Sequence, residues 1–263
     1  MIISMLNPLQ IIPILAFRDN YIWLIHNNIT AIVVDPGDAD VVLEVLTHLN
    51  LKPEAILITH HHHDHIDGVA TLVASYPTVT VYAPKLESYT FNHIPVAEPD
   101  TIEFEAINIK FSVIDLPGHT LGHLAYYANL NDDQTLLFCG DTLFGAGCGR
   151  QFEGTSAQMY ASLQKLAVLP PDTRIYCAHE YTLQNINFAL SLEPNNPALI
   201  ERQQEVIRLR SMQQSSIPST IQLELETNPF LRCHSDVIRT SIQLKNASFL
   251  QVFSTIRELR NHY

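Results

Sequence analysis

The sequence is poor in cysteine, and its few cysteines are not arranged as a disulfide framework. Four cysteines occur in 263 residues, and no two of them form a Cys-x-x-Cys pair; they are Cys139, Cys148, Cys177 and Cys233. Small secreted domains carry a much higher density of paired cysteines, so we expect free thiols in a reducing compartment. None of the four has the local signature of a catalytic nucleophile.

Basic residues are also scarce. The chain has 15 Lys and Arg against 27 Asp and Glu, a net charge of -12, and the basic residues form no run. Nucleic acid is a polyanion, so this balance argues against a nucleic-acid partner.

No stretch is apolar for long enough to span a bilayer. Residues 1–17 are rich in apolar side chains, but they include no basic region and are interrupted by Asn7, Pro8, Gln10 and Pro13. We therefore expect no signal peptide, no membrane partner and a cytoplasmic location. Apolar residues still make up 46% of the chain, which is enough for the core of one large domain or of one domain with a smaller appendage.

The first two thirds of the chain alternate between strand and helix patterns. Short β-branched runs predict strands at 31–35, 55–60, 79–84, 107–116, 123–128, 135–141 and 174–179. Apolar residues at helical spacing predict helices at 40–49, 66–75 and 156–167, and Thr155 with Gln158 forms a capping box before the last. This alternation is typical of an α/β fold.

The pattern changes after Glu180, where the strand signals fade. Residues 196–213 predict a strong helix, with Asn196 as its N-cap and Pro197 in its first turn. Residues 248–263 predict a last helix. We therefore place a mixed α/β domain at 1–179 and a smaller, mostly α-helical domain at 180–263.

The most unusual stretch is "THHHHDHIDG", residues 59–68, which lies between a predicted strand and a predicted helix. Loops in that position carry the sites of many α/β proteins, so a solvated, tag-like run is disfavoured. His60 and His62 are two residues apart, and in an extended chain their rings point the same way. Asp64 and His65 follow at the turn into the helix. Neutral imidazoles with a carboxylate suit zinc, iron or manganese.

Further metal-binding side chains follow three other predicted strands, and they are His119, Asp141 and His179. Any one of them alone is more often a surface residue or a satisfied core residue. Because all three stand at strand ends, as the tract does, we expect seven donor side chains to converge at one edge of a sheet.

Several motifs resemble those of a known superfamily. "THHHHDH", "LPGHTLGH", "CGDTLF" and "CAHEYT" are similar to the metallo-β-lactamase superfamily, and the stretches between them are closer to glyoxalase II, or hydroxyacylglutathione hydrolase. The closer matches are "IPILAFRDNYIWLI", "GDTLFGAGCGRQFEGT", "CAHEYTLQNINFA", "NPFLR" and the C-terminal stretch from Arg257 to Tyr263. The resemblance covers nearly the whole chain. It implies an αββα sandwich followed by an α-helical domain that binds the substrate.

The resemblance also implies two divalent metal ions, with zinc as the first expectation and iron or manganese as alternatives. The implied ligands are His60, His62 and His119 for the first ion, Asp64, His65 and His179 for the second, and Asp141 as a bridge. His63 occupies the variable position of the motif and is expected to be a spectator. His123 is either a hydrogen-bond partner within the site or a spectator.

The implied activity is hydrolysis of S-D-lactoylglutathione to glutathione and D-lactate, the second step of methylglyoxal detoxification. A hydroxide shared by the two ions would attack the thioester, and Asp64 would be a ligand that also orients it. The implied glutathione contacts are Arg150, Phe152, Tyr181, Asn185, Arg257 and Arg260. The family often has lysine where Arg150 and Arg260 stand and tyrosine where Phe152 stands, so the strength of glutathione binding is open.

Other functions are weighed against this one. A persulfide dioxygenase with a single iron ion would not be expected to carry the helical domain, whereas a thioesterase of other specificity would fit the same residues. A lactamase would need an export signal, and a tRNA-processing nuclease would need a basic surface. A structural zinc or interaction protein would use a closed, cysteine-rich site. We expect a monomer whose partner is a small-molecule glutathione thioester.

Overall fold

The computed structural model describes residues 8–130 and 134–263. Residues 1–7, which belong to the apolar N-terminal stretch considered above, lie outside the described residues, and so do residues 131–133.

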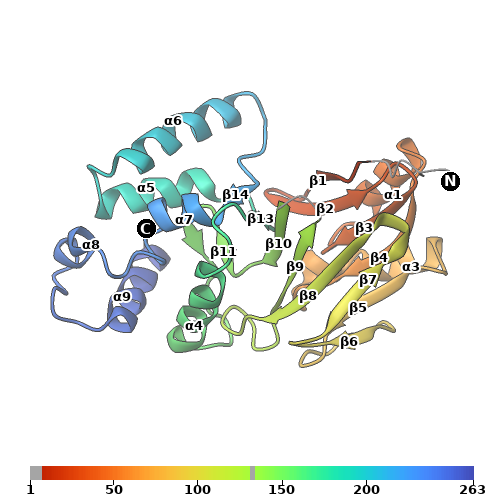
Figure 1. Ribbon diagram of the computed structural model, residues 1–263, viewed down its shortest axis with the longest axis horizontal. Coiled ribbons are helices and arrows are strands. Elements are labelled where there is room, and N and C mark those ends of the chain that lie inside the picture. The colour runs from red at the N-terminus through yellow and green to blue at the C-terminus, as the bar shows by residue number, and fades with distance from the viewer. Residues whose placement is uncertain (1–7, 131–133) are drawn as a thin grey trace.

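Two six-stranded sheets form the centre of the molecule and face each other (Figure 1). The first sheet has its strands in chain order, namely β1 (Gln10–Ala16), β2 (Asn20–His26), β3 (Thr30–Val34), β4 (Lys52–Leu57), β5 (Thr80–Pro84) and β6 (Ile94–Val96). The second sheet runs in the order β14 (Ser219–Thr220), β13 (Arg174–Cys177), β10 (Gln134–Gly140), β9 (Leu124–Leu130), β8 (Ile109–Asp115) and β7 (Thr101–Phe104). Strands β3 to β6 pair in parallel, as do β10 and β13, which accounts for the strand–helix alternation in the sequence.

Side chains alternate between the two faces of each inner strand, and this alternation divides the core into two layers. In β2, Trp23 and Ile25 join the cluster that contains residues of both sheets, whereas Ile22 and Leu24 join the cluster under the outer helices. All seven residues of β2 are buried, because this strand is covered on both faces.

Helices cover the outer face of each sheet and complete a four-layer sandwich (Figure 1). Helices α1 (Ala39–His48) and α3 (Val69–Ser75) lie on the first sheet, and Val42 and Leu46 of α1 are buried one turn apart against it. Helix α4 (Ser156–Ala167) lies on the second sheet, and its predicted capping box between Thr155 and Gln158 is confirmed. The αββα fold predicted from the sequence is therefore confirmed.

The helix predicted after the histidine tract begins at a different residue than expected, so this predicted boundary is wrong. The chain forms a short α2 (His63–Ile66) inside the tract, and α3 begins only after Gly68. Gly68 allows a close approach that a side chain would block, since an added Cβ would lie 2.5 Å from the carbonyl oxygen of Pro36. The predicted strand 55–60 likewise ends at Leu57, so the residues that follow are free to form the site.

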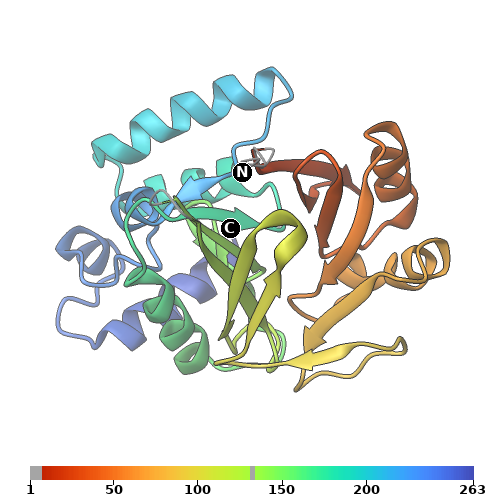
Figure 2. The same cartoon turned by 45° about the vertical axis from the view of Figure 1, so that its right-hand side comes forward.

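The C-terminal part is mostly helical, and in both views its helices lie on the side of the second sheet that faces away from the first (Figures 1 and 2). Its elements are α5 (Thr182–Leu192), α6 (Pro197–Ser211), α7 (Ile221–Thr227), α8 (Asp236–Ser241) and α9 (Phe249–Asn261). Asn196 caps α6 by accepting hydrogen bonds from the amides of Ala198 and Leu199, as the sequence predicts. The sequence does not predict β14, which adds a strand from this part to the second sheet.

Two further expectations can be compared with the structure. All four cysteines are unpaired, as predicted, and all four are also buried. No helix in residues 8–130 or 134–263 is both long enough and apolar enough to cross a membrane.

Candidate metal centre

Four loops at one end of the two sheets bring the predicted ligands together. The loop after β4 carries the histidine tract, and the loops after β8, β10 and β13 carry the other three residues, His119, Asp141 and His179. An isolated bridge between Asn20 and His179 joins the first sheet to the second at this end. The site therefore forms between the sheets, where strands of both end.

His60, His62 and His119 form the first group of donors. Nδ1 of His62 lies 3.0 Å from Nε2 of His60 and 3.0 Å from Nε2 of His119. His60 and His119 are buried, and His62 is partly exposed. Three ring nitrogens that approach this closely can act as ligands of one cation.

Asp64, His65 and His179 form the second group. Oδ2 of Asp64 lies 3.5 Å from Nε2 of His65 and 3.5 Å from Nε2 of His179. The side chain of Asp64 is 40% exposed, whereas the two histidines are buried, so this half of the site faces solvent through the carboxylate.

Asp141 lies between the two groups and faces each with a different oxygen atom. Its Oδ2 is 3.3 Å from Nε2 of His119, in the first group. Its Oδ1 is 3.3 Å from Nε2 of His179 and 3.6 Å from Nε2 of His65, in the second. One carboxylate can therefore bridge two cations, and the arrangement is that of a dinuclear metal site.

Hydrogen bonds on the outer side of the rings turn the inner nitrogens toward the centre. Nδ1 of His119 donates to the carbonyl oxygen of Arg150 at 2.7 Å, which leaves the lone pair on Nε2. Nδ1 of His65 is 3.0 Å from the carboxylate of Asp35, and Nδ1 of His179 is 2.9 Å from that of Asp19. A ring nitrogen beside a carboxylate carries the proton, so Nε2 of both rings is a free ligand atom.

Asp35 also organises the first group through Thr59. The amide and hydroxyl of Thr59 both donate to Asp35 at 2.7 Å, and the hydroxyl lies 3.1 Å from Nδ1 of His60. Because the hydroxyl donates to Asp35, it accepts from His60, whose Nε2 is then free. Asp19, Asn20 and Asp35 were not predicted from the sequence, although Asp35 ends a predicted strand, as Asp141 does.

His123 is a hydrogen-bond partner within the site. It is buried, its Nε2 accepts from the amide of Asp141 at 3.0 Å, and its Nδ1 lies 3.2 Å from the hydroxyl of Thr142. It therefore fixes the backbone that carries the bridging carboxylate. Gly140 precedes that carboxylate at φ +47, and a Cβ there would lie 2.3 Å from the hydroxyl of Thr59. The side chain of His63 is 92% exposed and contacts Asp67.

The buried atoms at the centre fit a bound cation. Nε2 of His65 and Oδ1 of Asp141 are buried and have no hydrogen-bond partner in the described residues. Buried polar atoms are rarely left without a partner, and a cation would satisfy both. Burial and the neighbouring charge of His119 lower the pKa of His62 to about 4, so its ring is neutral and able to bind a metal at neutral pH.

The second group holds an excess of negative charge. Burial lowers the pKa of His179, but the carboxylates of Asp141, Asp19 and Asp64 outweigh burial and raise that pKa to about 10. Burial raises the pKa of Asp141, but His179, His65 and His119 outweigh it and hold the pKa far below the usual range. Asp141 is thus ionised, and this half of the site attracts positive charge, which is a proton on His179 unless a metal ion displaces it.

Two of the predicted glutathione contacts lie at the rim of the centre. Phe152 is 61% exposed, and its ring centroid lies 5.5 Å from that of His62 and 5.2 Å from that of His119. The ring of Tyr181 stacks on His179 at 4.8 Å with an interplanar angle of 3°. Both aromatic rings therefore border the metal ligands, one at each half of the site.

Three of the other four predicted contacts are arginines, and we call Arg150, Arg257 and Arg260 the cationic cluster; the fourth is Asn185. Arg260 donates from Nε and from Nη2 to Oδ1 of the buried Asn185, at 3.2 and 3.1 Å. Burial and the nearby charges of Arg257 and Arg150 lower the pKa of Arg260. None of the three forms an ion pair with a carboxylate in the described part of the chain.

Arg257 is more deeply placed than the sequence suggests. Its side chain is 7% exposed, and Nη1 donates to the carbonyl oxygen of Cys148 at 2.7 Å. Its guanidinium carbon lies 5.1 Å from the centroid of Phe230, so the flat group is packed against an aromatic ring. Arg150, by contrast, is exposed and contacts Asn261 at 3.4 Å.

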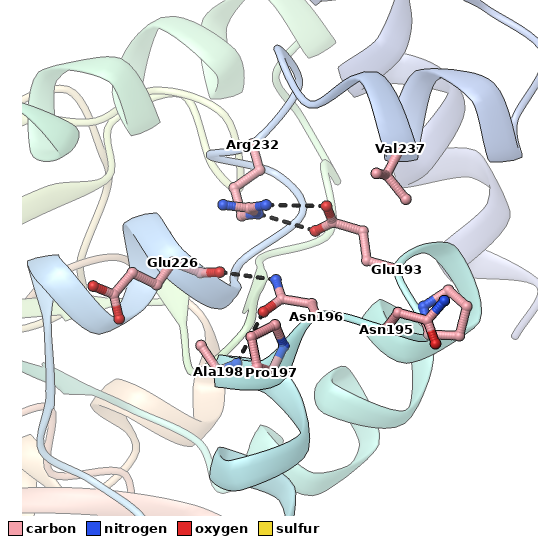
Figure 3. A pocket seen from close by; sticks show the side chains of 9 residues that line it. Glu193, Asn195, Asn196, Pro197, Ala198, Glu226, Arg232 and Val237 are labelled. Atoms are coloured by element: carbon pink, nitrogen blue, oxygen red, sulfur yellow. Dashed lines mark hydrogen bonds and ion pairs between the residues drawn. The ribbon is translucent and has the colours of Figure 1, made fainter.

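A cavity of about 470 Å³ elsewhere offers no comparable chemistry. It lies between the end of α5, the start of α6 and α8, and none of the predicted ligands lines it (Figure 3). Its one guanidinium, on Arg232, is already paired with both oxygens of Glu193 at 3.0 Å (Figure 3). The metal centre is therefore the better candidate for the functional site.

Comparison with known families gives two matches, which together span most of the chain. Residues 15–179 match the family model described as "Metallo-beta-lactamase superfamily". Residues 180–263 match the model described as "Hydroxyacylglutathione hydrolase C-terminus".

Relatives of high similarity match over almost the full length. The hydroxyacylglutathione hydrolase of Methylobacillus flagellatus is 52% identical and covers 97% of this chain and 99% of that protein. The one from Nitrosomonas eutropha is 46% identical over 97% of this chain and 99% of its own. Among solved structures, TTHA1623 in a di-iron-bound form has a TM-score of 0.59 and 26% identity, and the match covers 84% of this chain and all 100% of that one. On these matches and the geometry of its metal centre, the chain belongs to the hydroxyacylglutathione hydrolase family within the metallo-β-lactamase superfamily.

Proposed function

We propose that the protein hydrolyses S-D-lactoylglutathione to glutathione and D-lactate, the second step of methylglyoxal detoxification. The relatives bear the name of this activity over nearly the whole length of the chain. The observation that carries the proposal is the position of Asp141, whose two oxygens face two separate groups of three ligands. The persulfide dioxygenase alternative would not be expected to carry the helical domain, and the hydroxyacylglutathione hydrolase C-terminus model matches residues 180–263.

The seven side chains would divide between two divalent cations. His60, His62 and His119 would hold the first ion, Asp64, His65 and His179 the second, and Asp141 both. When bound, such a pair of ions supplies Lewis-acid chemistry, which lowers the pKa of water to about 7 and polarises a carbonyl oxygen. We propose zinc, with iron or manganese as alternatives, since this donor set accepts all three.

The protein's own groups hold and orient the reactants. Asp64 is the more exposed of the two carboxylates among the seven side chains, and Nδ2 of Asn20 donates to its Oδ2 at 2.8 Å. With that oxygen fixed, Asp64 would orient the attacking water at the open side of the centre. The buried imidazoles exclude bulk water from the opposite side.

A thioester suits this site because its leaving group needs no strong acid. Water adds to the acyl carbon, the carbon–sulfur bond breaks, and glutathione leaves as a thiolate that takes the proton released by the water. A thiol of pKa about 8.5 leaves readily without a general acid. We expect an ester, with its more basic alkoxide leaving group, to be a much poorer substrate.

The cationic cluster would bind the carboxylate at the glycine end of glutathione. The cluster brings three positive charges together in a chain of net charge -12, and none of the three pairs with a carboxylate of the described residues. It lies beside the loop that carries Asp141. The exposed Arg150 and the half-buried Arg260 would contact the ligand, and Arg257 would add charge from behind. Phe152, Tyr181 and Asn185 would complete this subsite. We propose a monomer that acts in the cytoplasm, where glutathione and reduced cysteines coexist.

The test combines metal analysis with a panel of acyl-glutathiones. The purified protein should contain two metal ions per chain and hydrolyse S-D-lactoylglutathione. Chelation should abolish activity, and zinc or manganese should restore it. Asp141→Asn should lower kcat by roughly two orders of magnitude or more while the chain stays folded, because the bridge loses its charge. Near-normal kcat in the metal-free protein would refute the proposal.

A further inference from the structure

The proposed function leaves His61 without a role, although it stands between two of the ligands. Its ring nitrogens face two carboxylates from different loops. Nδ1 lies 3.2 Å from Oε2 of Glu87, and Nε2 lies 3.2 Å from Oε1 of Glu153. We call these three residues, His61, Glu87 and Glu153, the His61 clasp.

Glu87 is the buried arm of the clasp. Its side chain is 3% exposed, and it accepts hydrogen bonds from the hydroxyls of Thr120 and Tyr89. An added Cβ at Gly122 would lie 2.4 Å from Cγ of Glu87, so only glycine lets that loop approach. Within the described residues, His61 is the only group capable of positive charge that pairs with this carboxylate.

Glu153 is the exposed arm. Its side chain is 36% exposed, and its Oε2 accepts from the amide of Leu121 at 2.9 Å. Its own amide lies 3.3 Å from the carbonyl oxygen of His119. Both arms of the clasp therefore end on residues that adjoin His119, the third ligand of the first group.

The clasp compensates for a hydrogen bond that the ring of His62 lacks. The outer nitrogens of His60, His119, His65 and His179 all have a partner that fixes the ring. His62 has none for its Nε2 in residues 8–130 and 134–263. Its ring is therefore held chiefly through the backbone, which His61 anchors one residue away. Fixing a ligand in place is what usually raises metal affinity.

We propose that His61 is a positioning residue for the first metal ion, because it ties the loop of His60 and His62 to the loop of His119 through Glu87 and Glu153. The proposal rests on the proposed dinuclear site. It predicts that loss of the clasp weakens one of the two metal sites and leaves the other intact, since the second group is fixed by Asp35 and Asp19 instead.

The experiment measures zinc affinity by competition with a chromophoric chelator in the full-length protein. We expect His61→Ala to bind one zinc ion as the wild type does and the other about 10- to 100-fold more weakly. Activity should return when excess zinc is added, because the weakened site fills by mass action. A residue needed only for folding would not give this selective, zinc-reversible loss.

The chain offers a matched control in the same tract. His63→Ala removes an exposed histidine two residues away whose ring pairs with Asp67, and it should bind both ions normally. His61→Asn should restore more affinity than His61→Gln, because an asparagine amide can replace Nδ1, which faces the buried Glu87. Glu153→Gln removes the charge of the exposed arm and should cause a smaller loss.

The result that overturns the proposal is wild-type affinity for both ions in His61→Ala. Should that variant not fold, wild-type affinity in both His61→Gln and Glu153→Gln would overturn it equally. These outcomes are separate from the proposed function. If the wild type binds two ions and hydrolyses the thioester while the variants match it, only the clasp is refuted.

Discussion

Asp35 offers a sharp test of how the fold prepares the metal ligands, through the substitution Asp35→Asn. Its carboxylate accepts from the amide and hydroxyl of Thr59 and from Nδ1 of His65. The residue has φ 53, a left-handed conformation that asparagine also tolerates. The substitution therefore changes a charge and an acceptor without straining the backbone.

The side-chain amide introduced by Asp35→Asn can take two orientations, and each disrupts a hydrogen bond or the protonation of a ligand. If its NH₂ group faces His65, Nδ1 of His65 must accept, and the proton moves to Nε2, the atom that should bind the metal. The hydroxyl of Thr59 must then donate to His60, which moves the proton of His60 to its inner nitrogen as well. If the amide is reversed, NH₂ meets the buried N–H of Thr59, which is left unsatisfied at a cost of about 1–3 kcal/mol.

One substitution thus disturbs a ligand of each group. We expect both zinc affinities to fall about 10- to 100-fold, which corresponds to roughly 1.4–2.7 kcal/mol per ion. The assay is a calorimetric zinc titration of the metal-free protein at pH 7.5, with kcat measured at saturating zinc. Asp38→Asn is the matched control, since Asp38 caps α1 three residues away and asparagine caps helices equally well. Zinc affinities within twofold of the wild type would refute the reasoning.

Two further predictions concern the helical part. Arg260→Ala should raise KM for S-D-lactoylglutathione about 10-fold with little change in kcat, because it removes charge that binds the substrate and its transition state alike; Arg208→Ala on α6 is the control, and an unchanged KM would exclude Arg260 from the subsite. Burial raises the pKa of Glu193, but Arg232 and Ser235 outweigh it and hold the pKa below 4.5. Its ionised form therefore stabilises the fold above pH 4.5, and that stability is lost as the pH falls through the lowered pKa. Glu193→Gln should lower the free energy of unfolding by about 1–3 kcal/mol at pH 7, and the difference from wild type should shrink below pH 4.5 in urea titrations. A difference that does not vary with pH would contradict this assignment.

Much of the site was predictable because the candidate metal ligands stand next to strand patterns that can be recognised in the sequence. His60, His119, Asp141 and His179 each follow a strand that its β-branched run identifies, and strand ends meet at sheet edges. The caps of α4 and α6 were equally local, since each depends on residues three positions apart or fewer. Such features need only neighbouring residues, so the sequence shows them directly.

The tertiary structure alone decided which distant residues complete the site. Asp19 lies 160 positions from His179, and Asp35 lies 30 from His65; no spacing in the chain announces either pair. The same holds for the two arms of the His61 clasp, for β14 on the second sheet and for the burial of Arg257 against Cys148. Their partners are set by the register of paired strands and by the packing of loops, and both depend on interactions throughout the chain. Sequence by itself determined the candidate ligands and the elements that bear them. The fold determined the hydrogen bonds that orient these side chains, because orientation depends on positions in space that no local pattern specifies.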